Sequence, residues 1–463
     1  MELVYLWVKK YKNIEEQGFN FSSKFYCEYN EEEKKLTINK NDDYIPDFFG
    51  ENINVTAIVG KNGSGKSSLL KLENNIPNNI EIIYDNDVLY IISSKAKFNT
   101  MTIINKTTCV IKNRGTNAYN KSKLYFNWDI IKPVYGDIYR SMNKIKDTNI
   151  LKPLLQKEDS HLLDLHYFNI EIMKKIIQFN HEFSFQTFFY KPYYIELHII
   201  TENKEELEVY NVGKKILQLE IVRKQKMKFD EFFDSYYKDN KEDVNQLLSK
   251  ELLLFKITDI EGRDFFDLSH GERSIFLTNL ILFDKVKEKN TDLIIYLDEP
   301  DLTLHPEWQK RYMNELVKTF SSWDKKIHFI ITSHSPFIVS DIPKENIIFL
   351  KDGKQVNGLK EKKQTFGANI HTLLSDSFFM EDGLIGEFAK SKIDDVINYF
   401  HGKESKIKDN DEAQKLIHII GEPIVKNQLQ RMLDSKRLKK IDKIDAIEKD
   451  IKALQEALAK LKK

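Results

Sequence analysis

Cysteine, net charge and long apolar runs are all scarce in this chain of 463 residues. The two cysteines, Cys27 and Cys109, lie far apart and have no histidine pairs nearby, which excludes a disulfide framework and a zinc site. The 71 basic residues balance the 71 acidic ones, so no global field draws the protein to nucleic acid or to an anionic membrane. No apolar run approaches the roughly 18 residues of a membrane span, and the first residues lack the apolar core of a signal peptide. We therefore expect a soluble, cytoplasmic protein.

The length of the chain predicts two or three packed units rather than one core. In the first 50 residues, alternating apolar and polar side chains favour short strands at 3–8, 25–29 and 35–39. We expect these strands to form a sheet at the edge of the fold.

Residues 60–67, Gly-Lys-Asn-Gly-Ser-Gly-Lys-Ser, match the phosphate-binding pattern G-x-x-x-x-G-K-[ST]. A short buried strand is predicted at 54–59 and the start of a helix at 68–72, which is the context that this pattern needs. Glycines let successive backbone N–H groups turn toward one point, where an anion would bind. Lys66 would reach the β- and γ-phosphates of ATP, and the Ser67 hydroxyl would ligate Mg²⁺. The predicted nucleotide-binding residues of the loop are Gly60, Asn62, Gly63, Ser64, Gly65, Lys66, Ser67 and Ser68.

A second strand carries two acids at its end. Four of the five residues at 293–297 are apolar aliphatics, as a parallel strand buried on both faces requires, and Asp298 and Glu299 follow directly. Asp298 would hold Mg²⁺, directly or through water. Glu299 would orient and deprotonate the attacking water as general base.

Two further segments complete an ordered set. Leu268-Ser269-His270-Gly271-Glu272-Arg273-Ser274 precedes an apolar, helix-like run; taken alone, it is an ordinary serine-capped helix. A buried strand at 326–331 ends in a polar turn that contains His334. Phosphate loop, signature-like segment, acid pair and histidine follow one another as in the ABC superfamily, and the chain resembles its SMC-like, RecF-like and OLD-like ATPases more than its transporters.

This resemblance implies roles for several residues. Ser269 and Gly271 would contact the γ-phosphate of a nucleotide held by another subunit, and Glu272 belongs with them to the predicted nucleotide-binding residues. His334 would contact the γ-phosphate within its own subunit, so Lys66, Glu299 and His334 are the predicted catalytic residues. His270 departs from the glycine or serine that the family usually carries there.

The segment after the acid pair, Asp301-Leu-Thr-Leu-His305-Pro306, resembles that of OLD-like and defence-associated ABC ATPases. In those families this segment crosses the dimer interface, which implies that Asp301 and His305 are interface residues. Alternatively, His305 only caps the helix that Pro306 begins.

The predicted fold is an α/β ABC-type P-loop ATPase head with a lid or arm insertion and an α-helical C-terminal domain. A glutamine loop cannot be assigned among Gln156, Gln178 and Gln186. Lysines and aromatics in the insertion, such as Lys123, Tyr125 and Tyr194, fit either simple packing or a nucleic-acid surface. The expected divisions are the head at 1–75 and 251–360, the insertion at 76–250, a helical domain at 361–435 and an amphipathic tail at 436–463.

The tail carries apolar residues at spacings of 3, 4, 3, 4 and 3, which is a heptad stripe. These residues are Ile444, Ile447, Ile451, Leu454, Leu458 and Leu461. The stripe needs a partner, and docking within the chain, self-association and docking of an effector all remain open. A basic cluster at 436–443 would be the place for a local DNA contact, although a solvated helix face explains it more simply.

The C-terminal region resembles the standalone ATPases of Septu and PARIS anti-phage systems. No strand in it ends in the paired acids of a nuclease of the OLD type. We therefore expect an ATP-binding and ATP-hydrolysing sensor or regulator subunit, acting as a homodimer or higher oligomer, which controls a nuclease or toxin supplied in trans. The alternative is a RecF-like or SMC-like DNA-repair ATPase that binds DNA directly.

Overall fold

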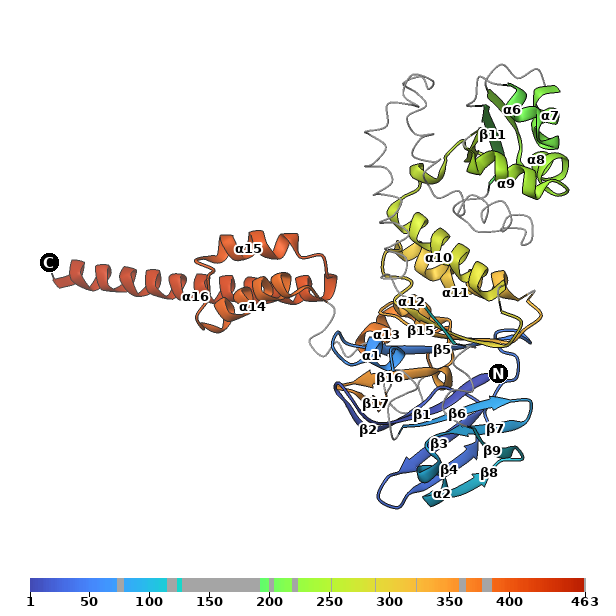
Figure 1. The fold of residues 1–463 in the computed structure, drawn as a ribbon. Coiled ribbons are helices and arrows are strands. Elements are labelled where there is room, and N and C mark those ends of the chain that lie inside the picture. Colours follow the sequence, from blue (N-terminus) through green and yellow to red (C-terminus); the bar gives the residue numbers. More distant parts are fainter. Residues whose placement is uncertain are drawn as a thin grey trace. The chain divides into compact units, whose positions relative to one another are not determined.

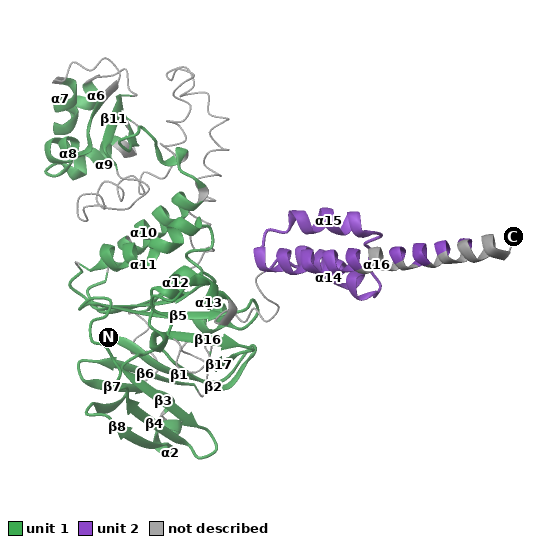
Figure 2. Cartoon of the chain, turned by 180° about the vertical axis from the view of Figure 1, so that it is seen from behind, with its two compact units in different colours: residues 1–380 green, residues 381–463 purple. Residues whose placement is uncertain are grey.

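The computed structural model describes residues 1–72, 79–114, 123–126, 192–199, 204–218, 224–250, 252–287, 289–321, 323–357, 364–376 and 385–461. The chain divides into two compact units, Met1–Met380 and Glu381–Lys463 (Figure 2). No described helix is long and apolar enough to cross a lipid bilayer.

A six-stranded sheet forms the centre of the first unit (Figure 1). Five of its strands pair in parallel, and only the last pair of strands is antiparallel. Its members, in spatial order, are β10 (Lys123–Phe126), β14 (Leu293–Asp298), β15 (Ile327–Thr332), β5 (Ile53–Gly60), β16 (Ile347–Lys351) and β17 (Lys354–Val356). The three middle strands are almost continuously apolar because both faces of the sheet are covered.

Alternate residues of these strands enter two different cores. On one face, residues such as Ile295 and Ile331 pack against α10 (His270–Lys287), α11 (Pro306–Phe320) and α12 (Pro336–Ser340). On the other face, residues such as Ile294 and Ile330 pack against β1 (Glu2–Tyr11) and α1 (Lys66–Leu70). The period of two along each strand therefore fixes the layer order of helices, sheet and N-terminal strands.

Two further sheets are built mainly from the N-terminal region. One has the order β2 (Ile14–Asn20), β1, β6 (Ile80–Asp85), β7 (Val88–Ile92) and β9 (Val110–Arg114), and the other the order β3 (Phe25–Asn30), β4 (Lys35–Lys40) and β8 (Thr102–Lys106). The strands predicted within the first 50 residues are confirmed, and β2 is an additional one. A short helix, α2 (Lys95–Thr100), joins β7 to β8.

The N-terminal sheets include residues that the predicted bounds assign to the insertion. Residues 80–114 were expected to belong to it, but β6 pairs antiparallel with β1, and β8 pairs parallel with β4. Lys123 was considered for a nucleic-acid surface, but it forms an ion pair with the buried Glu81. Cross-strand pairing thus places this stretch with the N-terminal sheets, and β10 in the central sheet.

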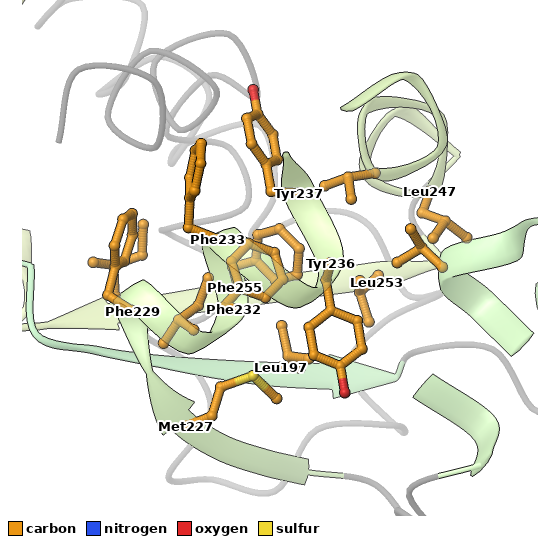
Figure 3. Packing of buried hydrophobic residues seen from close by; sticks show 14 of the residues in the cluster. Leu197, Met227, Phe229, Phe232, Phe233, Tyr236, Tyr237, Leu247, Leu253 and Phe255 are labelled. Carbon is orange, nitrogen blue, oxygen red and sulfur yellow. The ribbon is translucent and has the colours of Figure 1, made fainter. Parts of the chain in front are cut away.

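The described remainder of the insertion forms a small α/β subdomain together with the strand at Leu253–Thr258, which lies past the predicted boundary at 250. A sheet of β12 (Lys224–Lys228), β11 (Tyr194–Ile199) and β13 (Leu253–Thr258) packs with α6 (Lys204–Glu208), α7 (Asn211–Gln218), α8 (Phe229–Phe232), a π-helical turn at Phe233–Tyr237 and α9 (Lys241–Ser249). Figure 3 shows its core, in which Phe232 and Phe255 meet edge to face. The core continues onto α10 through Phe276 and Phe283, so the subdomain is anchored on that helix.

The second unit consists of three described helices, α14 (Glu387–His401), α15 (Asn410–Ile419) and α16 (Pro423–Leu461). They bury a small core that includes Val396, Ile417 and Leu433. The expected boundary at 435 lies inside α16, which is one continuous helix of 39 residues. Of the stripe, Ile444, Ile447 and Ile451 are exposed.

His328 joins the central sheet to the N-terminal strands. It is fully buried on β15, its Nδ1 accepts a hydrogen bond from Leu3 N at 3.1 Å, and its Nε2 lies 2.8 Å from Thr56 Oγ1. Thr56 Oγ1 in turn donates to Phe21 O. Because Nδ1 accepts, the ring is neutral and carries its proton on Nε2. Burial lowers the pKa of His328 to about 3.

We predict that this histidine makes the fold sensitive to acid. His328 binds a proton at a higher pH in the unfolded chain than in the folded chain. Its contribution to the free energy of unfolding is therefore complete above about pH 6.5 and is lost as the pH falls toward 3. Over that range the loss is at most about 5 kcal/mol. His328→Asn keeps an acceptor for Leu3 N but cannot be protonated, so its free energy of unfolding should fall less steeply with pH in denaturant titrations. Parallel pH profiles for the two proteins would contradict the prediction.

Candidate active site

The strand order brings the sequence motifs to one edge of the central sheet. Strand β5 leads into the phosphate loop, β15 beside it ends before His334, and β14 beside β15 ends at Asp298. Asp298 is opposite Thr332, and Thr332 is opposite Ile58. Because the strands are parallel, their carboxyl ends meet at this edge, where ligands commonly bind in open α/β sheets.

The phosphate loop has backbone geometry that glycine allows. Gly63 and Gly65 have φ values of 78° and 110°, in the left-handed region. Gly60 is needed for another reason: a Cβ there would lie 2.2 Å from Leu350 O of the neighbouring strand. The Ser64 hydroxyl is buried and has no hydrogen-bond partner in the structure. An uncompensated buried donor is unfavourable, and a bound phosphate oxygen would satisfy it.

Lys66 lies inside the loop. Its side chain is buried, and Nζ donates to Gly60 O at 3.0 Å and to Lys61 O at 3.3 Å. Burial lowers the pKa of Lys66, and the negative charges of Glu299 and Asp298 partly offset this effect. An ammonium group held only by carbonyl oxygens can exchange them for the stronger acceptors of a phosphate.

Three hydroxyl groups surround the Asp298 carboxylate. Ser67 Oγ donates to Oδ1 at 3.1 Å, and Thr332 Oγ1 donates to the same oxygen at 2.7 Å. Tyr125 of β10 donates to Oδ2 at 3.1 Å. Carboxylate and hydroxyl oxygens are the ligands that Mg²⁺ prefers, so Ser67 and Asp298 fit the predicted metal site. The tyrosine was not expected here from the sequence.

Glu299 and His334 face each other beside this carboxylate. Their Oε1 and Nε2 atoms are 3.3 Å apart, and both side chains are about one third exposed. Glu299 has a φ of 50°, and its N–H donates to Thr332 Oγ1 at 2.9 Å. A non-glycine residue in the left-handed region is uncommon and often marks a functional site. Burial and the charge of Lys66 lower the pKa of His334, while Glu299 opposes this shift. The imidazole is therefore neutral at physiological pH.

The signature-like segment forms a capped helix start. Ser269 Oγ accepts from Glu272 N at 3.3 Å, and Glu272 Oε2 accepts from Ser269 N at 2.7 Å, which is a capping box. Gly271 lies against the turn after β14, because a Cβ there would be 2.7 Å from Thr303 O. The simple interpretation, a serine-capped helix, is thus what the chain adopts by itself. A role toward another subunit's nucleotide stays a prediction.

The two predicted interface residues differ in exposure. Asp301 is buried, at 3% exposed, and accepts a hydrogen bond from Ser333 Oγ at 2.9 Å. His305 is exposed and caps α11, with Nδ1 accepting from Glu307 N. Leu302, between them, is 64% exposed. The surface of this turn is therefore presented by Leu302 and His305, while Asp301 points into the chain.

The structure brings together Lys66, Ser67, Asp298, Glu299 and His334, as the order of motifs predicts. Their roles in nucleotide binding and hydrolysis remain predictions. Sequence reasoning missed the contact of Tyr125 with Asp298, since the short strand β10 carries no motif of its own. Gln156, Gln178 and Gln186, considered for a glutamine loop, lie outside the described residues.

Known proteins resemble parts of this chain. Residues 123–340 match the family model described as "AAA domain, putative AbiEii toxin, Type IV TA system". The "Retron Ec83 probable ATPase" of Escherichia coli is 34% identical over 119 residues, which is 24% of this chain and 21% of that protein. The "Retron Vc95 probable ATPase" of Vibrio cholerae is 29% identical over 119 residues, 24% of this chain and 22% of that protein.

A third relative is the "Septu protein PtuA" of Bacillus mycoides, 29% identical over 119 residues, 24% of this chain and 16% of that protein. The chain resembles the ABC-type ATPases of defence systems. The predicted resemblance is thereby confirmed, and the structure shows the predicted mixed α/β fold with a helical C-terminal region. The alignments span about a fifth of the length of these relatives. What those whole proteins do is therefore only a proposal for this chain.

We predict that Tyr125 supports the magnesium-dependent part of nucleotide binding. Tyr125→Phe removes the hydroxyl that fixes Asp298 Oδ2 and should weaken ATP binding about fivefold when Mg²⁺ is present, equivalent to about 1 kcal/mol. With EDTA the loss should disappear. Isothermal titration calorimetry under both conditions measures this, with the exposed Tyr26→Phe as control. An equal loss with EDTA would refute the link to Asp298.

Proposed function

We propose that this chain binds ATP with Mg²⁺ and hydrolyses it at the edge of the central sheet. One observation carries the proposal. The buried lysine of the glycine loop, the Asp–Glu pair and the histidine lie together at the ends of three adjacent parallel strands. Each of these groups suits phosphoryl transfer to water, which depends mainly on positioning and charge stabilisation.

The side chains divide this work among them. The loop N–H groups and Lys66 hold the phosphates, and Ser67 and Asp298 hold Mg²⁺, which would neutralise the charge that develops on the phosphate oxygens. Glu299 orients the attacking water and takes its proton. His334 presents a neutral imidazole next to Glu299 and donates to the γ-phosphate.

Two copies of the chain complete each site in this proposal. Ser269, Gly271 and Glu272 occupy the start of α10, where Ser269 and Glu272 are exposed or half-buried. The exposed Leu302 and His305 lie on the turn that contacts Gly271. Another copy would meet these residues on the exposed turn and at the start of α10. ATP then favours the associated state, and hydrolysis favours separation.

The biological role that we infer is regulation within a bacterial defence complex. Its support is the similarity to two retron ATPases and a Septu protein. The chain would sense an infection-linked trigger in the cytoplasm and control a nuclease or toxin supplied in trans.

Glu299→Gln should bind ATP normally but hydrolyse it at least a hundredfold more slowly, because the amide cannot accept the proton of the attacking water. The variant should also accumulate as a nucleotide-bound oligomer in sedimentation experiments. Lys66→Ala is the matched control and should lose ATP binding itself. An unchanged hydrolysis rate in purified Glu299→Gln would refute the assignment of Glu299 as base.

The regulatory role predicts a stable protein partner. A tagged chain purified from its native host with Mg²⁺ and ATP should bring down a nuclease or toxin in stoichiometric amount, identified by mass spectrometry. The Lys66→Ala chain serves as a comparison for nucleotide dependence. DNA alone in the eluate, lost at high salt, would instead support direct DNA binding by a repair ATPase.

A further inference from the structure

The turn that carries His334 is tied to the turn after β14 by side-chain hydrogen bonds. Ser333 Oγ donates to Asp301 Oδ2 at 2.9 Å and accepts from Ser335 N at 2.8 Å. The residues on both sides of His334 thus share one hydroxyl group, whose position Asp301 sets. None of these residues is part of the phosphate loop or touches Asp298 in the structure through a hydrogen bond.

A second connection runs parallel to the first. Ser335 Oγ donates to Gln309 Oε1 at 2.8 Å, and Gln309 Nε2 donates back to Leu304 O at 3.0 Å and to Asp301 O at 3.4 Å. We call Asp301, Gln309, Ser333 and Ser335 the clasp. It holds His334 between two serines that are each bonded to the segment 301–309.

The clasp includes a carboxylate in an unfavourable environment. Asp301 is 3% exposed and Ser333 is fully buried, and Asp301 Oδ1 has no hydrogen-bond partner among the residues that the structure describes. Burial raises the pKa of Asp301 to about 6. A buried carboxylate with only one satisfied oxygen lowers the stability of the fold. Such a group calls for an explanation, and a functional role for its position is one.

The other end of the clasp reaches the protein surface. The turn that begins with Asp301 presents Leu302, 64% exposed, and its Thr303 O lies against Gly271 of α10. The turn is closed tightly, since Leu304 N donates to Asp301 O at 3.0 Å and Leu302 N donates to Glu299 O at 3.2 Å. A displacement of the exposed turn therefore moves Asp301, and with it the serine that anchors His334.

We propose that Asp301 is a positioning residue that holds His334 toward Glu299 through Ser333, and so couples the exposed turn 302–305 to the hydrolytic centre. The proposal rests on the proposed function, in which His334 and Glu299 act on the γ-phosphate. It assigns Asp301 a role inside its own subunit, distinct from a direct contact across a dimer interface.

Ser333→Ala tests the proposal by removing the hydroxyl that links Asp301 to the histidine turn. The expected result is a fall in kcat of tenfold or more with an ATP dissociation constant within about twofold of wild type, because small displacements of a catalytic group are costly while the phosphate loop is untouched. Asp301→Asn retains an acceptor for Ser333 and should retain most activity. Ser340→Ala, which removes a nearby hydroxyl bonded to Ala368 O, is the matched control.

The decisive comparison repeats Ser333→Ala in the His334→Ala background. If Ser333 acts through His334, the second substitution should slow hydrolysis by less than about twofold there, since effects along one chain of contacts are not additive. The same tenfold fall in both backgrounds, or wild-type kcat in Ser333→Ala, would overturn the proposal.

A structural measurement separates this outcome from failure of the proposed function. The ring resonances of His334, assigned by NMR through their loss in His334→Ala, should shift in nucleotide-free Ser333→Ala and stay in place in Ser340→Ala. An unmoved His334 signal would also overturn the positioning role. Absence of ATP hydrolysis in the wild-type chain, with the NMR shift intact, would reject only the hydrolytic function.

Discussion

The parallel pairing of β5, β15 and β14 is the constraint on which the site depends. Each strand is apolar enough to be buried on both faces, and the acids and the histidine of the site lie at or just past the strand ends. Parallel direction then brings those ends to the same edge, and the registers that align Ile58, Thr332 and Asp298 bring them to the same level. The chemistry at this edge follows from how the sheet is buried.

Helix α10 extends this constraint to the rest of the first unit. Ile275 and Leu282 face the central sheet, whereas Phe276 and Phe283 belong to the aromatic core of the inserted subdomain. One helix thus joins the signature-like segment, the central sheet and the subdomain. A rotation of α10 would displace residues in all three, because close-packed cores have low compressibility and transmit strain.

Sequence reasoning succeeded where a local pattern has one physical meaning. The glycine loop, the acids after β14 and the histidine after β15 are each defined within a few residues, and the structure brings them together. It failed where pairing between distant segments decides. Strand β10 joins the sheet through β14, about 170 residues later in the chain, and β6 joins β1 across some 70 residues. Such non-local partners leave little trace in the local sequence.

The same limit applies to Asp301 and to α16. The buried position of Asp301 depends on Ser333, 32 residues away, and could not be told from an exposed interface acid by its neighbours in sequence. The predicted division at 435 falls where the basic cluster begins, but helix α16 continues through it to Leu461. The isoleucines beyond that point are exposed. A heptad stripe in the sequence indicates that a helix could pair with a partner, but it does not say which partner that is.

The contact between Gly271 and Thr303 O bears on how related sequences should be interpreted. Any side chain at position 271 would collide with the turn after β14 within the same molecule. Selection for a correctly packed monomer would therefore keep glycine there even in a descendant that had lost all nucleotide chemistry. A glycine at this point of a homologous sequence is evidence of inherited packing, and only the neighbouring polar residues can indicate whether the proposed composite site is present.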